Sequence, residues 1–261
     1  MKFLLLLGCV LPLLGCKITK LTSSEPEVPS LMVPSSPRQS QTDQTPSITL
    51  DGLLTEPQWE QSARTTPFVH PGSGDQIPGN FGGSARLFWD STWLYIAFEV
   101  RDPSPTSPFL PEAVDPHIWS RASGVEIMIQ PGDFADNKHY FEVQVDMKGS
   151  LWDTHFSDYN QPRTKKRGLT LFGHQSWDSH TKRAVKLTAA GYTLEMAIPW
   201  SALSFKKPPD RAINLPPKSK DIWRLNLYVF RDAQRLSRAW SPLLGKGNFH
   251  RTSRFGRVSF R

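Results

Sequence analysis

The chain has 261 residues, a formal net charge of +7 and an isoelectric point near 9.5. Apolar residues make up 38% of it, including nine tryptophans, which is enough for a sizeable core and excludes a chain that is disordered throughout. The two cysteines, Cys9 and Cys16, lie near the N-terminus, so the rest of the chain cannot carry the internal disulfides of a small stapled scaffold.

The first 15 residues predict a signal peptide. Lys2 precedes the apolar run Phe3–Leu14, whose length of about 12 residues falls short of the roughly 20 that a membrane-spanning helix needs. The ending Leu13-Leu14-Gly15-Cys16 resembles the lipobox of bacterial lipoproteins, which are cut before the cysteine and acylated on it. The resemblance implies lipidation of Cys16 and a lipid-anchored, extracytoplasmic protein of the bacterial cell envelope. Lys17 is compatible with the outer membrane, and the alternative is an ordinary secretory signal that ends in cysteine.

A disordered linker is predicted from Cys16 to residue 46. Half of residues 17–46 are Pro, Ser or Thr, and none is aromatic. Such a segment cannot bury enough apolar area to offset the entropy lost on ordering. Because its prolines favour extended conformations, we expect a spacer that holds the folded part away from the membrane.

Residues 47–261 predict one β domain. In Trp93–Arg101 the apolar side chains alternate with a period of two, which indicates a half-buried strand, and residues 125–130 and 140–146 repeat the pattern. Further strands are expected at Ser84–Asp90, Leu151–Phe156, Arg183–Thr188, Tyr192–Ile198, Ile222–Phe230 and Arg257–Phe260.

Helix is scarce in this domain. Glu56–Ser62 predicts about two turns and residues 199–203 one more, with Thr55 as the cap of the first. Many strands with short turns predict an all-β fold, a two-sheet antiparallel β-sandwich with one or two short helices. Trp59, Trp89 and Trp200 are expected in its core.

Five blocks of sequence follow one another between residues 48 and 260. They are Asp51–Trp59 (DG-x-x-x-E-x-x-W), Trp89–Asp102 (W-D…LY…D), Val125–Ile129 (VE-apolar), Gly191–Trp200 (GY-x-x-E-x-x-IPW) and Phe255–Val258 (FG-x-apolar). Together they resemble the family 9 carbohydrate-binding module and its DOMON-like relatives. The resemblance implies a non-catalytic module that binds a poly- or oligosaccharide, and modules of that family are commonly appended to glycoside hydrolases. We therefore expect the chain to assist carbohydrate catabolism by separate hydrolases.

The resemblance also implies two aromatic residues that clamp a sugar. The first position matches Trp119, in a loop rich in turn residues, and the second matches Phe249, which is followed by His250. Where many relatives carry a proline and an acid after this histidine, the chain has Arg251 and Arg254, which questions a neutral reducing-end ligand. The alternative for Trp119 is ordinary packing.

Strand alternation predicts polar partners for such a ligand. If three predicted strands are neighbours, as in the family, five side chains share one face of a sheet: Glu126, Glu142, Gln144, Arg224 and Asn226. Carboxylate and amide groups can bridge adjacent sugar hydroxyls. The alternative is a solvated face whose Glu–Arg pair contributes little to stability.

Other chemistry finds less support. Glu126 and Glu142 could approach the carboxylate separation of a glycosidase, but no deep cleft is predicted between them, so no catalysis is expected. Calcium is plausible by resemblance, with Asp51, Asp90 and Asp102 near turns, although each has an equally good turn-capping role. A haem-binding alternative would use residues of the predicted sheets: Met128, His139 and His155.

Basic residues cluster in residues 163–167 and 251–261. Outside the cytoplasm such a face would attract an anionic envelope glycan, which is an alternative partner, as is a protein bound by an envelope scaffold. No base-reading motif accompanies the charge, so nucleic acid is not an expected partner.

Overall fold

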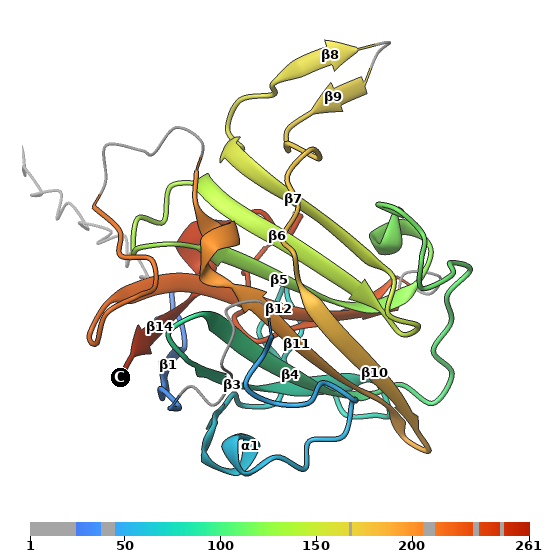
Figure 1. The fold of residues 1–261 in the computed structure, drawn as a ribbon. Helices are drawn as coiled ribbons and strands as arrows, with labels where there is room; N and C mark the ends of the chain where they lie inside the picture. The colour runs from blue at the N-terminus through green and yellow to red at the C-terminus, as the bar shows by residue number, and fades with distance from the viewer. Residues whose placement is uncertain (1–24, 38–44, 167–168, 206–211, 232–234, 246–247) are drawn as a thin grey trace, which may run out of the picture.

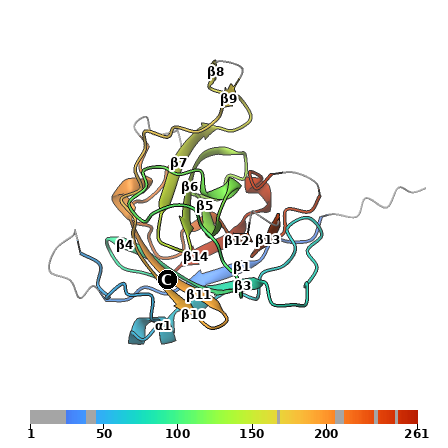
Figure 2. The ribbon, with the colours of Figure 1, turned by 90° about the vertical axis from the view of Figure 1, so that its right-hand side faces the viewer.

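The computed structural model describes residues 25–37, 45–166, 169–205, 212–231, 235–245 and 248–261. In this part of the chain two β-sheets pack face to face, with one short helix and a few 3-10 turns (Figures 1 and 2). The predicted all-β sandwich is confirmed. Each predicted strand is present, and its ends differ from the prediction by at most two residues.

The larger sheet has seven strands. Its order is β1 (Ser30–Val33), β14 (Gly256–Phe260), β12 (Ile222–Arg231), β5 (Ser123–Gln130), β6 (Lys138–Asp146) and β7 (Leu151–Asp158), with β13 (Leu236–Ala239) also on β12. Only β1 and β14 run parallel. The long strand β12 changes partner along its length, because Ile222–Leu225 pairs with β14 and Tyr228–Arg231 pairs with β13.

The smaller sheet is antiparallel. Its order is β10 (Lys182–Thr188), β11 (Gly191–Pro199), β4 (Trp93–Arg101), β3 (Gly82–Trp89) and β2 (Ala63–Arg64). The helix α1 (Pro57–Gln61) lies on its outer face, and the hairpin of β8 (Thr164–Lys166) and β9 (Leu169–Leu171) projects beyond the end of β7 (Figure 1). The 3-10 turns are η1 (Ile118–Ser120), η2 (Trp200–Leu203) and η4 (Thr252–Arg254).

Alternate side chains of the strands point inward and fill the space between the two sheets. Val125, Ile127 and Ile129 of β5 are fully buried there, in one cluster with Ile96 and Phe98 of β4. Each such side chain contributes about 1.5–3 kcal/mol relative to exposure. The three tryptophans expected in the core also pack: Trp59 and Trp200 are buried, and Trp89 is half-buried with its ring edge-on to Trp200 at 6.2 Å.

A buried carboxylate clasps the start of the domain to the smaller sheet. Glu195 of β11 accepts hydrogen bonds from the backbone N–H of Asp51 at 2.9 Å and of Gly52 at 2.7 Å, and from Trp59 Nε1 at 2.7 Å. Gly52 has a φ of 81°, and a Cβ there would lie 2.7 Å from the nitrogen of Lys186. Two of the sequence blocks that resemble the family therefore meet at this clasp. Glu56 rather than Thr55 precedes the helix.

Part of the segment predicted as a linker belongs to the folded domain. Residues 30–33 form β1 on the edge of β14, Val33 is fully buried, and Leu31 packs against the core. Arg254 Nη1 also donates to the carbonyl of Pro26 at 2.6 Å. The prediction of disorder is wrong here because composition alone does not count the hydrogen bonds that a sheet edge offers.

The signal peptide and Cys16 lie outside the described residues. Across the part of the chain that the structure describes, no helix is long and apolar enough to cross a membrane.

Candidate functional site

A cavity of about 890 Å³ lies over the outer face of the seven-stranded sheet. Strands β12, β5, β6 and β7 form its floor, which confirms that the three strands with the predicted polar residues are neighbours. Register places Glu126 beside Gln144 and Gln144 beside Trp152. Six of the eight residues predicted for a sugar site line this cavity: Trp119, Glu126, Glu142, Gln144, Phe249 and His250.

The floor is built around one amide between two acids. Gln144 Nε2 donates to Glu126 Oε2 at 2.9 Å and to Glu142 Oε1 at 2.7 Å. All three side chains are at least 96% buried. Burial raises the pKa of Glu142 to about 8, and burial together with the nearby charge of Glu142 raises the pKa of Glu126 well above its usual range. Glu126 and Glu142 therefore hold protons at neutral pH.

Several polar atoms of this floor have no hydrogen-bond partner among the described residues. They are Glu126 Oε1, Glu142 Oε2, Gln144 Oε1, Trp152 Nε1 and Thr154 Oγ1. Buried polar groups are nearly always paired in folded proteins, because each unpaired group costs about 1–3 kcal/mol. Because these residues line a cavity, the free atoms are placed to bond a polar ligand.

His250 forms part of the cavity wall as a neutral imidazole. Its Nδ1 lies 2.8 Å from the hydroxyl of Tyr140, and burial lowers the pKa of His250 to about 3. Burial raises the pKa of Tyr140, which therefore keeps its proton. With the hydroxyl as donor, the imidazole proton is on Nε2, which lies 3.9 Å from Glu142 Oε2. The ring also stacks on Tyr159, with centroids 3.9 Å apart.

Trp119 and Phe249 both line the cavity. Trp119 is 36% exposed, its ring stacks on His117 at 4.6 Å, and it meets Trp152 edge-on at 4.5 Å. Trp119 is thus accessible to solvent, in contrast to the ordinary packing considered as its alternative. Phe249 is half-buried and lies flat on Tyr228, with an interplanar angle of 4°. Both rings are braced by other aromatic rings, so they are held in position before a ligand binds.

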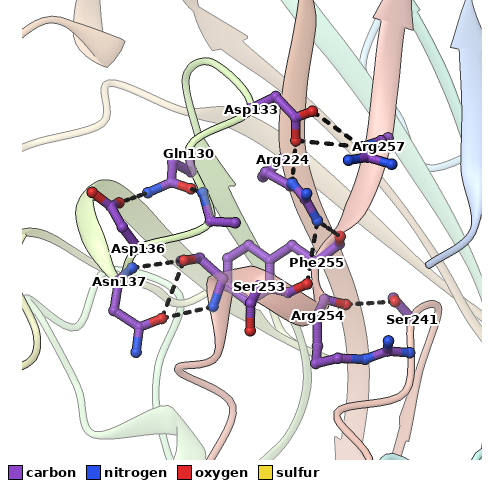
Figure 3. Close-up of polar contacts among 12 residues, drawn as sticks. Gln130, Asp133, Asp136, Asn137, Arg224, Ser241, Ser253, Arg254, Phe255 and Arg257 are labelled. Carbon is purple, nitrogen blue, oxygen red and sulfur yellow. Dashed lines mark hydrogen bonds and ion pairs between the residues drawn. The ribbon is translucent and has the colours of Figure 1, made fainter. Parts of the chain in front are cut away.

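Arg224 lies on the predicted face but away from the cavity. It forms an ion pair with Asp133, which also pairs with Arg257 (Figure 3). Its Nη1 donates to the carbonyls of Ser253 at 3.3 Å and Phe255 at 3.1 Å. The guanidinium thus fixes the segment that follows Phe249 and His250 along the chain, and is not placed to touch a ligand in the cavity.

Asn226 sits where β12 changes partner from β14 to β13. Its Nδ2 donates to the hydroxyl of Tyr228 at 2.7 Å and to the carbonyl of Ser241 at 2.9 Å. Its Oδ1 accepts the N–H groups of Leu227 at 3.0 Å and Ser241 at 2.9 Å. These four hydrogen bonds use the full hydrogen-bonding capacity of the amide. Asn226 therefore stabilises the point where β12 changes partner and has no donor or acceptor left for a sugar.

Sequence reasoning missed several lining residues. Trp152 and Thr154 could have been found, because alternation along β7 places them beside Gln144 and Glu142. Tyr159 comes from a turn, and Phe172 from the irregular chain after β9, where no periodicity guides a prediction. Their rings stack at 4.5 Å.

The three aspartates considered for calcium have other partners. Asp51 accepts the N–H of Leu53, Asp90 caps the turn before β4, and Asp102 pairs with Arg231. The residues considered for haem do not come together, because they lie on opposite faces of the seven-stranded sheet. Met128 lines the cavity on the outer face. His155 follows Thr154 on the opposite face of β7, where it stacks on His174 at 4.2 Å.

The family profile described as carbohydrate family 9 binding domain-like matches residues 50–261. The chain belongs to this family. It is a carbohydrate-binding-module-like β-sandwich, and family 9 modules are typically non-catalytic.

Two curated enzymes contain related sequence. The chain is 24% identical over 143 residues to endo-1,4-beta-xylanase C of Paenibacillus barcinonensis, and 26% identical over 121 residues to exoglucanase XynX of Acetivibrio thermocellus. The matches cover 54% and 46% of this chain, but only 10% and 9% of the two enzymes.

Solved structures share the fold of this family 9-like domain. A family 9 carbohydrate-binding module from Caldicellulosiruptor kristjanssonii, in complex with cellotriose, has a TM-score of 0.57 at 16% identity, covering 89% of this chain and 93% of that one. A Bacteroides uniformis protein has a TM-score of 0.64 at 17% identity, covering 90% and 100%. At such identities the likeness is one of fold alone.

Proposed function

We propose that this chain binds a poly- or oligosaccharide in the cavity over the seven-stranded sheet. The observation that carries the proposal is the set of unpartnered buried polar atoms on the cavity floor, enclosed by aromatic rings. Sugars have apolar C–H faces and hydroxyl edges. An aromatic ring supports the first, and a paired acid and amide bond the second.

Each cavity residue has a distinct part in this proposal. Trp119 and Phe249 offer the ring faces, whereas Glu126, Glu142 and Gln144 supply the hydrogen-bonding atoms. Arg224 does not contact the ligand in this proposal. It supports the site indirectly, because it fixes the segment that follows His250 along the chain. Neighbouring side chains hold the two aromatic rings and the side chains of Glu126, Gln144 and Glu142 in place. Little conformational entropy is therefore lost when these groups bind a ligand.

Three arginines of the basic cluster at residues 251–261 already have partners within the fold. Arg251 pairs with Glu25, Arg254 donates to two carbonyls, and Arg257 pairs with Asp133. Because these three arginines are engaged in contacts within the fold, they are less available to an anionic glycan at the surface. This supports binding in the cavity rather than on the basic surface.

We further propose that the protein is anchored through Cys16 in the bacterial cell envelope, in the outer membrane, and supplies bound glycan to separate hydrolases in carbohydrate catabolism. The lipobox-like ending supports the anchor. The xylanase and exoglucanase that contain related sequence support the link to glycan breakdown.

A glycan-array screen of the full chain, at low and at high salt, tests the binding proposal. Stacking and buried hydrogen bonds resist salt, whereas attraction between surface charges is screened. We expect binding that survives high salt. Binding only to polyanions, lost at high salt, would instead identify a basic-surface receptor, and a screen without binding would favour a protein-binding scaffold.

A further inference from the structure

The cavity floor brings two acids together without a basic partner. Glu126 and Glu142 are 2% and 4% exposed, and the donor they share is Gln144 Nε2. Arg163 and Arg235 line the same cavity, yet within the described chain neither forms an ion pair with either acid. Arg163 donates to the carbonyl of Gly173 at 2.9 Å instead.

The groups that face the two acids offer no positive charge either. Those with a titratable proton are Tyr140 of β6, Tyr228 of β12, Tyr159 and His250. Burial raises the pKa of each tyrosine and lowers that of His250, so all four are neutral near pH 7. A pair of buried acids without a cation is costly to ionise, and an incoming cation would remove that cost.

Three oxygens on this floor lack a hydrogen-bond partner among the described residues. They are Glu126 Oε1, Glu142 Oε2 and Gln144 Oε1, each on a side chain at least 96% buried and lining the cavity. A hydroxyl group carries one donor, whereas an ammonium group carries three and no acceptor. Once Glu126 and Glu142 have lost their protons, the number of acceptors and the negative charge of the two carboxylates both match an ammonium group.

We propose that the cavity binds a glycan whose sugar carries a free amino group, held as an ammonium by Glu126, Glu142 and Gln144. This inference rests on the proposed function and narrows it to one class of sugar. On binding, the carboxyl groups release their protons to solvent, and the N–H groups of the ammonium donate to the oxygens that become free. Trp152 Nε1, an unpartnered donor, is then available to a sugar oxygen.

The charge of the whole molecule does not produce this preference. With a net charge of +7, long-range attraction favours anionic glycans and repels cationic ones. A preference for an amino sugar must therefore arise from the buried acids.

Three β-1,4-linked trimers that differ only at C2 provide the test, by calorimetric titration of the full chain near pH 6.5. Cellotriose carries a hydroxyl there, the glucosamine trimer an ammonium and its fully acetylated form an amide. Galactosamine and mannosamine against their parent sugars extend the comparison to other configurations. We expect an amino sugar to bind about tenfold or more tightly than its hydroxyl and acetylated counterparts, because charge-assisted hydrogen bonds are about twice as strong as neutral ones.

Three results would overturn the inference or both proposals. If the neutral or acetylated sugar binds as tightly as its amino counterpart, the inference fails and the proposed function stands. The same holds if no amino sugar binds while another glycan does in the array screen. If no glycan binds in either experiment, both fail.

Isosteric variants locate the preference. In Glu126→Gln and Glu142→Gln the affinity for the amino sugar should fall more than the affinity for its neutral counterpart, so that the preference drops by about tenfold or more. Glu60→Gln removes an exposed acid on α1 and should change nothing. If the glutamine variants, checked for native melting, keep the preference, the ammonium does not lie at this floor.

Proton release gives a second readout that needs no variant. Titrations in buffers of different ionisation enthalpy should reveal release of about one proton or more per amino sugar bound near pH 6.5, because the free floor is protonated. Binding of an amino sugar without proton release would place its amine outside the two acids.

Discussion

At the scale of single residues, the arrangement of Glu126, Gln144 and Glu142 links recognition to protonation. One amide holds both acids in place, and their burial keeps protons on them at neutral pH. In the unfolded chain these acids have an ordinary pKa near 4.5 and lose those protons. The folded state thus binds more protons than the unfolded state between about pH 4.5 and pH 8, so stability falls as the pH rises through this range.

The variant Glu142→Gln tests this linkage. Each such carboxyl can contribute a slope of at most about 1.4 kcal/mol per pH unit to the free energy of unfolding between pH 5 and pH 8. We expect the wild type to lose stability across this interval, and the variant to show a shallower slope. Urea unfolding at several pH values measures it, with Glu60→Gln as the control. An unchanged slope in Glu142→Gln would contradict the assignment.

At the scale of elements, the clasp made by Glu195 joins the first segment of the domain to β11. Its carboxylate satisfies three donors, and it is fully buried. Glu195→Ala would leave these donors unpaired, so we expect a loss of about 3–5 kcal/mol in the free energy of unfolding. Glu195→Gln, which keeps one acceptor oxygen, should lose less. Chemical denaturation measures both, and a loss below about 1 kcal/mol in the alanine variant would show that the clasp is dispensable.

Strand β1 offers a test of the correction to the predicted linker. Val33 and Met32 are neighbours on one strand, but Val33 is fully buried and Met32 is 56% exposed. Val33→Ala should therefore cost about 2 kcal/mol, and Met32→Ala less than about 0.5 kcal/mol. Thermal or urea melts compare the two. Equal, small effects would mean that β1 does not belong to the stable domain.

Alternation predicted the elements well because period two is set by local geometry. It placed Glu126, Glu142 and Gln144 on one face, and the register then brought them together. It could not reveal that Arg224 and Asn226, on the same face, make their hydrogen bonds within the fold. Arg224 bonds to the segment around Ser253 and Phe255, and Asn226 bonds to Ser241 where β12 changes partner. These roles depend on contacts between distant parts of the chain, such as that of Asn226 with Ser241.

The same limit applies to the loops around the cavity. Trp119 was found through a resemblance, whereas Tyr159 and Phe172 carry no periodic signal. The prediction of a disordered linker is wrong at β1, because β1 pairs with the edge of β14, which lies more than 200 residues away in sequence. Local composition contains no record of that edge.

At the scale of the whole molecule, docking of β1 shortens the proposed tether. Glu25 is held to Arg251, and the nine chain steps from Cys16 to Glu25 can span at most roughly 30 Å. The proposed anchor thus keeps the domain close to the membrane, rather than at the end of a 30-residue spacer. Arg251 directly follows His250, a residue of the cavity wall, in the sequence.

Anchoring itself is tested with Cys16→Ser. We expect the wild type in the membrane fraction of the native bacterium, with a mass that includes acyl chains, because two or more chains give stable attachment. The variant should lose the acyl chains and leave the membrane fraction. A wild-type protein without acyl chains would favour the ordinary secretory signal.

Calorimetric titration with the glycan that binds best in the array screen tests the central claim, that the cavity over the seven-stranded sheet is the binding site. It compares the full chain with Trp119→Ala, which removes a braced ring at the cavity, and with Leu187→Ala, which removes an exposed side chain on β10 of the other sheet. The account predicts that Trp119→Ala weakens binding by about 10- to 30-fold, or about 1.4–2 kcal/mol, and that Leu187→Ala leaves it unchanged. Equal affinity in all three proteins would place the glycan elsewhere and contradict the account.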